Sequence, residues 1–396
     1  MEENKFYKRN LKLIKTEAVL TSIGAAFSIP IMTVFWNSIG MNQVAIGFVQ
    51  MIFTIVILFF DVPMGYIADR FNRKAFNIVG DFGCALAFAF YMFAQNMYMA
   101  IAAECLLGIF LAMTNGVDNS FIKYNSDKLD ENGKLFKKNV AQVEKYKFVA
   151  VIIGMTIGMF ISRYSLRAAI GVTFIPYFIG GIIAMFIPDI GEKSKVIHKN
   201  PLKDMVHNMR EIMKSKKVRW YVVAYMLARE VTHPVIWVFT PLMILAGVPV
   251  HIVAIGWIFS YIFATIGTHI AGKTTNLRFS SKFALPIIAC ISWMSILIID
   301  VNIVTVWVFA FNGLAQGFTS GSLMPSIQAE IKDEFQTTAV SVASTASRLF
   351  YIPLVYVLNL MANDKPQMAL IGNLAIFLPL GLITYIQLRK MESKTT

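Results

Sequence analysis

The stretch Asp61-Val-Pro-Met-Gly-Tyr-Ile-Ala-Asp-Arg-Phe-Asn-Arg-Lys74 lies between two long apolar segments and decides how the rest of the chain is arranged. It concentrates two acidic and three basic residues where the chain is expected to leave the apolar interior of a membrane. Pro63 and Gly65 are expected to let the backbone turn sharply and to let two helices approach closely. The stretch therefore predicts a charged connection between two membrane helices.

The composition is that of a protein solvated by lipid. Of the 396 residues, 57% are hydrophobic and only 15% are charged, and the mean hydropathy is +0.61. Soluble domains carry roughly 25% charged residues. Apolar runs of about 20 residues, enough to cross a bilayer as a helix, recur along the chain. The chain is predicted to be an all-α membrane protein, and its first run, longer than a signal-peptide core, is expected to be retained.

Twelve membrane-spanning helices are predicted from these runs. Their expected ranges are 17–38, 44–62, 75–94, 97–119, 140–162, 167–188, 218–246, 251–272, 283–300, 303–325, 337–361 and 367–388. The one long polar segment divides the chain into an N-terminal six-helix bundle (1–188), a cytoplasmic linker (189–217) and a C-terminal six-helix bundle (218–396). Within the linker, apolar residues recur at helical spacing over 201–213, which predicts an amphipathic helix at the membrane surface.

The distribution of basic residues supports this topology. With the N-terminus in the cytoplasm, the outer loops hold only Arg163, Arg167 and Lys365 of the 36 Lys and Arg residues. Arg229 and Arg348 fall within predicted spans, and the remainder lie on the cytoplasmic side, as the positive-inside rule predicts. The net charge of +13 is therefore interpreted as a topology signal, and no nucleic-acid partner is expected. Both termini are predicted to lie in the cytoplasm, with the protein in a bacterial plasma membrane.

The charged stretch resembles the Gly-x-Leu-Ala-Asp-Arg-x-Gly-Arg-Lys signature of the major facilitator superfamily, which stands between the second and third membrane helices. The matching residues here are Gly65, Ile67 (for Leu), Ala68, Asp69, Arg70, Asn72 (for the second Gly), Arg73 and Lys74. Asp61, four residues before Gly65, matches the extended Asp-x-Pro-x-Gly form of many efflux members. The competing interpretation is a basic loop that follows membrane topology alone.

The resemblance implies two six-helix bundles around a central substrate site and transport by alternating access. It also implies that clustered charge at the cytoplasmic side stabilises one state of the transporter. Asp118, toward the inner end of the fourth span, is expected to meet Arg70 or Arg73 in this gate. The expected gate residues are Asp61, Gly65, Asp69, Arg70, Arg73 and Asp118.

Ionisable residues inside the predicted spans are candidates for ion coupling or substrate binding, because each costs about 2.5–3.5 kcal/mol at the bilayer centre. Glu104 stands where the superfamily normally has Arg, and its competing interpretation is a Glu hydrogen-bonded to a neighbour. Arg229 and Glu230 are consecutive, about 100° apart on a helix, and are not expected to pair well with each other. Glu230 and Arg348 are expected to serve transport or to form a structural ion pair. Glu17 is expected at the membrane interface, where the first span starts.

No soluble-enzyme constellation is recognised in the sequence, so neither enzymatic activity nor a cofactor is expected. Cys84, Cys105 and Cys290 lie in apolar runs without metal-binding spacing, so no metal site is expected. Gly154 and Gly158 form a GxxxG pattern that predicts a close helix contact. Without a nucleotide-binding domain, transport is expected to use an ion gradient or the substrate's own gradient.

The leading functional hypothesis is a monomeric secondary transporter in the lipid bilayer that exports a small amphiphilic or cationic compound in exchange for protons. The Asp-x-Pro-x-Gly form favours this hypothesis, whereas the absence of the antiporter motif from the fifth span weighs against it. Two alternatives stay open: an ion-coupled symporter that imports a nutrient or a metal chelate, and a transporter-like receptor or lipid flippase.

Overall fold

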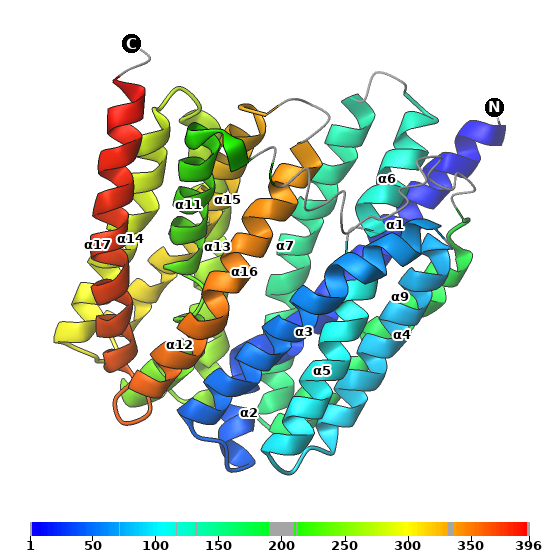
Figure 1. Ribbon diagram of the computed structural model, residues 1–396. Coiled ribbons are helices and arrows are strands. Elements are labelled where there is room, and N and C mark those ends of the chain that lie inside the picture. The colour runs from blue at the N-terminus through cyan, green and yellow to red at the C-terminus, as the bar shows by residue number, and fades with distance from the viewer. Residues whose placement is uncertain are drawn as a thin grey trace. The chain divides into compact units, whose positions relative to one another are not determined.

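A computed structural model of the chain is shown in Figure 1. It describes residues 2–70, 72–115, 117–130, 134–189, 210, 213–331 and 336–393. All regular secondary structure in these residues is helical. The chain divides into two compact units. Unit 1 comprises Met1–Gly40 and Ile52–Ile197, and unit 2 comprises Met41–Met51 and His198–Thr396.

The first half of the chain forms the helices from α1 to α9. They are α1 (Glu2–Ser28), η1 (Ile29–Ile31), α2 (Met32–Ser38), α3 (Gln43–Arg70), α4 (Arg73–Met92), α5 (Met97–Thr114), α6 (Val117–Asp127), α7 (Lys134–Ser162), α8 (Leu166–Gly171) and α9 (Phe174–Phe186). The first residues of α3 belong to unit 2, where the Gln43 amide donates a hydrogen bond of 2.7 Å to Asn359.

The second half of the chain forms the helices from α11 to α17. They are α11 (Lys216–Glu230), α12 (Ile236–Leu245), η2 (Val250–Ile252), α13 (Val253–Lys273), α14 (Phe279–Ile299), η3 (Thr305–Phe309), α15 (Ala310–Gln328), α16 (Gln336–Met361) and α17 (Gln367–Glu392). The amphipathic helix predicted over 201–213 lies outside the described residues, apart from single positions at its end.

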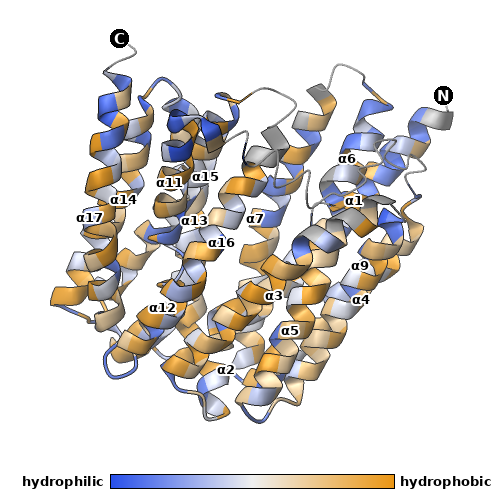
Figure 2. Cartoon of the chain, in the orientation of Figure 1, coloured by the Kyte–Doolittle hydropathy of each residue, from blue (hydrophilic) through white to orange (hydrophobic). Residues whose placement is uncertain are grey.

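The helices confirm the prediction of an all-α membrane protein. Within the described ranges, ten helices are long and apolar enough to cross a membrane. The pair α11–α12 and the more polar α15 occupy the ranges of two further predicted spans, so the helices are consistent with twelve. Figure 2 shows apolar residues over most of each helix. In each unit, hydrophilic residues gather at the helix ends that lie near the chain terminus of that unit.

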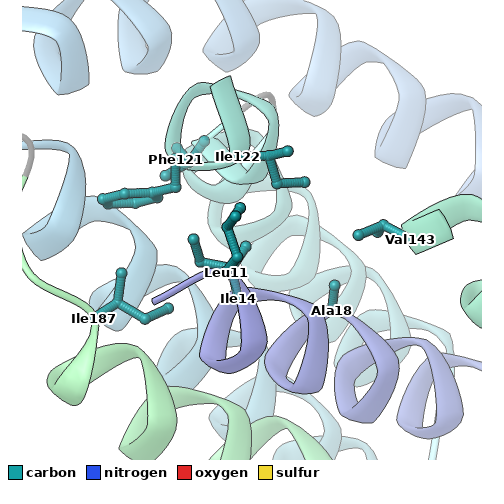
Figure 3. Close-up of a cluster of buried hydrophobic side chains, with 8 residues drawn as sticks. Leu11, Ile14, Ala18, Phe121, Ile122, Val143 and Ile187 are labelled. Atoms are coloured by element: carbon teal, nitrogen blue, oxygen red, sulfur yellow. The ribbon is translucent and has the colours of Figure 1, made fainter. Parts of the chain in front are cut away.

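Unit 1 is held together by the packing of α1 against α6, α7 and α9. The predicted GxxxG contact is confirmed, because a Cβ on Gly154 would lie 2.4 Å from the Ile23 carbonyl oxygen and one on Gly158 would lie 2.3 Å from that of Phe27. Closer to the N-terminus, α1 buries apolar side chains against α6 and α7 (Figure 3). This apolar cluster consists of Leu11, Ile14, Ala18, Val117, Phe121, Ile122, Val143 and Ile187.

The first span begins earlier than predicted. The basic residues before 17 were expected to precede the helix, whereas α1 starts at Glu2 and is buried at Leu11 and Ile14. The physical reason is that α6 and α7 cover this part of α1 and provide polar partners for it. The Lys15 ammonium donates to the Asn139 and Gln142 side chains, each at 2.7 Å.

The signature stretch also differs from its prediction, which placed a sharp turn at Pro63 and Gly65. Helix α3 instead continues through Pro63 to Arg70. The turn comes at Asn72, whose side chain accepts a hydrogen bond of 2.8 Å from the Ala75 amide and caps α4. Asn in place of the second signature Gly therefore provides a helix N-cap.

In unit 2, the backbones of α13 and α15 lie so close together that only glycine fits at the contact. A Cβ on Gly313 would lie 1.8 Å from the Ser260 carbonyl oxygen, and one on Gly317 would lie 1.9 Å from that of Ala264. The sequence analysis missed this contact, although the Gly-xxx-Gly spacing in α15 was a signal for it.

Residues 267–274 read Gly-Thr-His-Ile-Ala-Gly-Lys-Thr, the letter pattern of a phosphate-binding loop, which the sequence analysis also overlooked. A phosphate-binding loop needs free backbone N–H groups after a strand. Here the pattern lies in α13, which is helical as far as Lys273. Gly267 packs against α15, where a Cβ on it would lie 2.3 Å from the Leu314 carbonyl oxygen. The pattern therefore marks a helix contact.

Replacing Gly313 by Val is expected to destabilise unit 2 by about 1–3 kcal/mol, because α13 and α15 must move apart to admit the side chain. Thermal unfolding of the purified protein in detergent would measure this. The matched control is Gly272→Val on α13, because nothing lies within 4 Å of a Cβ at Gly272. Equal unfolding temperatures for the two variants would contradict the close contact.

Candidate functional site

The seventh span is broken in its middle. The sequence predicted one helix over 218–246, but α11 ends at Glu230 and α12 begins at Ile236. Pro234 explains the break, because its ring clashes with the carbonyl of Glu230 four residues earlier and it has no N–H to donate. Discontinuous helices are a common way for transporters to expose backbone and charged groups at the bilayer midplane.

Two buried asparagines satisfy the backbone carbonyls that the break releases. Asn312 on α15 donates to the Thr232 carbonyl oxygen at 3.2 Å, and Asn373 on α17 donates to that of Val231 at 2.9 Å. Both side chains are fully buried. In the membrane no water replaces these donors, so the two asparagines make the break stable.

A cluster of ionisable side chains surrounds the end of α11. Glu230 is buried, with 1% of its side chain exposed, and its Oε1 lies 3.5 Å from Arg229 Nε. Its Oε2 lies 3.5 Å from His233 Nδ1, and the His233 ring packs on Tyr351 at a centroid distance of 4.6 Å. Arg229 and Glu230 were not expected to pair well, whereas the structure brings them into an ion contact at the end of α11.

Arg348 lies on α16, which packs against α11. The ion partners that the structure describes for Glu230 are Arg229 and His233. The pairing of Glu230 with Arg348 stays a prediction.

A polar pocket of about 280 Å³ adjoins the ion cluster. Its lining residues are Tyr225, Arg229, Gln316, Thr319 and Ser320. The hydroxyl of Thr319 is buried and has no hydrogen-bond partner among the described residues. The pocket thus offers a guanidinium group, hydroxyl groups and an amide to a polar solute.

Glu104 lies on α5 and is buried, with 3% of the residue exposed. Its Oε1 accepts a hydrogen bond of 2.7 Å from the Tyr91 hydroxyl on α4. This is the neighbour-bonded arrangement given above as the competing interpretation. Glu104 has a structural partner, and a role for it in coupling stays a prediction.

Two of the predicted gate acids have defined partners. Asp61 accepts a hydrogen bond of 2.7 Å from the Asn115 side chain, at the break between α5 and α6. Asp118 lies 3.7 Å from Lys147 Nζ on α7 and thus has a lysine partner where an arginine of the signature was expected. The side chains of Asp69 and Arg70 lie outside the described part of the chain, Gly65 lies within α3, and Arg73 begins α4. The gate as a whole stays a prediction.

A second buried polar group lies in unit 1 and was missed by the sequence analysis. Glu17, Asn77 and Asp81 are each at most 2% exposed. Glu17 was expected at the membrane interface, where the first span starts; α1 begins at Glu2 and places Glu17 well inside the helix, and its position relative to the membrane stays a prediction. The i, i+4 spacing of Asn77 and Asp81 within an apolar run was the signal that could have found them.

Within the described residues, no group of three or more His, Cys, Asp or Glu side chains could hold a metal ion.

Comparisons with known proteins agree on one family. The sequence profile described as Major Facilitator Superfamily matches residues 18–353. An uncharacterized MFS-type transporter of Methanocaldococcus jannaschii is 25% identical over 197 residues, which are 49% of this chain and 48% of that protein. The chain thus covers about half the length of this curated relative.

Solved structures of several transporters share the fold. A mutant of the nucleoside transporter NupG has a TM-score of 0.80 at 14% identity, covering 96% of this chain and 99% of that one. A POT family transporter in complex with 5-aminolevulinic acid has a TM-score of 0.77 at 10% identity, covering 96% of each chain. A bacterial homolog to the human lysosomal transporter Spinster has a TM-score of 0.74 at 12% identity, covering 97% of each chain. At these identities the likeness shows the fold alone.

Replacing Asn312 or Asn373 by the near-isosteric Leu is expected to destabilise the protein by about 1 kcal/mol or more, because each change leaves a carbonyl of the break without a donor. Thermal unfolding in detergent measures the effect. The control is Asn363→Leu at an exposed turn. Unfolding temperatures as high as that of the control would contradict the role of the two asparagines.

Proposed function

This chain belongs to the Major Facilitator Superfamily, and we propose that it is a proton-coupled transporter that exports a small amphiphilic compound by alternating access. The family and the fold support a secondary transporter in which the chain crosses the membrane several times. The proposal adds the direction, the coupling ion and the kind of substrate. It also places a monomer in a bacterial plasma membrane with both termini in the cytoplasm.

One observation favours transport through unit 2: the polar pocket next to the broken helix shares Arg229 with the buried Glu230. Because Arg229 both lines the pocket and pairs with Glu230, a substrate in the pocket competes for one of these two charges. A cationic group displaces Arg229 and binds Glu230, whereas an acidic group draws Arg229 away from Glu230. Either exchange links occupancy of the pocket to the geometry of the α11–α12 break.

The direction of transport is proposed from the signature stretch. Asp61 matches the form seen in efflux members, and the gate set of Asp61, Gly65, Asp69, Arg70, Arg73 and Asp118 is proposed to hold the inner side closed in one state. The Asp61–Asn115 and Asp118–Lys147 contacts connect this region to α5, α6 and α7. Movement of α3 against α5 would change the Asp61–Asn115 contact, and movement of α6 against α7 would change the Asp118–Lys147 contact.

A second candidate function is proton-coupled uptake of a nutrient that has an acidic group. The observation that favours it is the charge of the pocket, because Arg229 is its charged lining residue. An acidic substrate meets Arg229 directly at the pocket wall. A cationic exporter, by contrast, must bring its substrate past Arg229 to reach Glu230, which is 1% exposed.

Reconstituted vesicles with an imposed pH gradient test the proposal with two amphiphilic probes of opposite charge, ethidium and fluorescein. Vesicles with the cytoplasmic face outward are expected to accumulate at least one probe when their lumen is acidic. Arg229→Gln is expected to change the ratio of the two probes, because it removes the charge of the pocket. Asp364→Asn, an exposed loop change, serves as the control.

Four results would contradict the proposal. Accumulation that does not depend on the pH gradient would show that transport is not coupled to protons. Accumulation only in vesicles of the opposite orientation favours uptake. Binding of the probes without accumulation favours a receptor, and accelerated movement of a labelled lipid between leaflets favours a flippase.

A further inference from the structure

Two carboxyl groups are buried together in unit 1. Glu17 on α1 and Asp81 on α4 are each 2% exposed, and their side chains interact with each other. Asn77, one turn before Asp81, donates from Nδ2 to Glu17 Oε1 at 3.2 Å. The group therefore joins α1 and α4 through polar atoms that lie inside apolar helices.

The acceptors in this group outnumber its donors. Glu17 Oε2, Asp81 Oδ2 and Asn77 Oδ1 have no hydrogen-bond partner in the described part of the chain. A buried acceptor without a donor destabilises the fold, and two adjacent carboxylates add repulsion between like charges. One proton between the two carboxyl groups removes both costs, because it supplies the missing donor and neutralises one charge.

We propose that Glu17 and Asp81 share a single proton between Glu17 Oε2 and Asp81 Oδ2, and that this pair is the proton-binding site of the transporter. The inference rests on the proposed function, because it names the residues that would hold the coupling ion. It also assigns the two binding sites to different units: unit 1 binds the proton, and unit 2 binds the substrate.

The surroundings of the pair fit this role. Asp118 on α6 acts electrostatically on both carboxyl groups, and it is itself paired with Lys147. Loading a proton onto the pair therefore changes the repulsion felt by a residue of the proposed gate. Among the described residues, Cys84 on α4 and Tyr177 on α9 are further titratable groups that interact electrostatically with Asp81.

Gly180 on α9 leaves space beside the pair. A Cβ at this position would lie 3.1 Å from Asp81 Oδ2 and 2.9 Å from Thr21 Cγ2. The carboxyl group of Asp81 thus faces a glycine at the oxygen that lacks a donor. Filling this space would disturb the proposed bridge without removing either carboxyl group.

Infrared difference spectroscopy of the full-length protein in lipid, with pH jumps in H₂O and D₂O as the probe, tests the inference. The wild type is expected to show a protonated-carboxyl band that disappears at high pH. Glu17→Gln and Asp81→Asn are each expected to lose the same component of this band, because two carboxyl groups that share one proton titrate as a unit. Asp364→Asn is expected to retain the band.

Retention of this component in either variant would overturn the inference, and so would loss of a different component in each variant, which shows independent groups. Gly180→Ala, which keeps both carboxyl groups, is expected to displace the midpoint of the band, and an unchanged midpoint would contradict the bridge at Asp81 Oδ2. Replacing NaCl by choline chloride is expected to change nothing, whereas a shifted midpoint would show a sodium site.

The vesicle assay separates failure of this inference from failure of the proposed function. A wild type that accumulates neither ethidium nor fluorescein under a pH gradient refutes the proposed function, and the infrared result then stands alone. If the wild type responds to the gradient, Glu17→Gln and Asp81→Asn are expected to lose gradient-driven accumulation but to retain exchange of probe across the membrane. Full accumulation by these variants would refute the coupling role of the pair.

Discussion

The structure of unit 2 depends on one constraint: backbone carbonyls inside a membrane need a hydrogen-bond donor from the protein. Pro234 interrupts the seventh span and releases such carbonyls, and Asn312 and Asn373 supply the donors. A helix that is broken but satisfied in this way can end at a charged residue in the middle of the bilayer. The cluster of Arg229, Glu230 and His233 exists because α11 ends there.

Helix α15 contributes both to the break in the seventh span and to the polar pocket beside it. Its positions 312, 316, 319 and 320 follow the 3.6-residue period and lie on one face, which provides the donor to the break and the polar wall of the pocket. Gly313 and Gly317 belong to a neighbouring face that packs on the backbone of α13. This close contact holds a helix that is too polar to be fixed in the membrane by hydrophobic burial alone.

Much of the architecture could be predicted from the sequence because it depends on local composition. Apolar runs of spanning length, the asymmetry of basic residues and the spacing around Gly65 led to the all-helical membrane fold and the family. The glycine pair in α7 was predicted for the same reason, since its packing depends only on side-chain size. The length of α1 could not be predicted, because a basic helix is stable there only when α6 and α7 cover it.

The residues of the candidate sites were harder to predict because they depend on tertiary partners. A prediction from helical periodicity places Arg229 and Glu230 on an unbroken helix. It therefore did not include the contact that the two side chains make at the end of α11. Glu17 and Asp81 are 64 positions apart in sequence, and only the tertiary fold, in which α1 and α4 both pack on α9, brings their side chains together. The side chain of Asn72, in contrast, acts within its own turn, and its departure from the signature was visible in the sequence.

The central claim is that the polar pocket beside the break in the seventh span is accessible to water and has a cation in its wall. The most direct test is the rate at which Ser320→Cys reacts with charged thiol reagents that do not enter lipid, in a background without the three native cysteines. The account predicts reaction at Ser320→Cys, faster with an anionic than with a cationic reagent because of Arg229, and no reaction at the exposed apolar position Ile288→Cys. Equal inertness of both positions toward the charged reagents would contradict it.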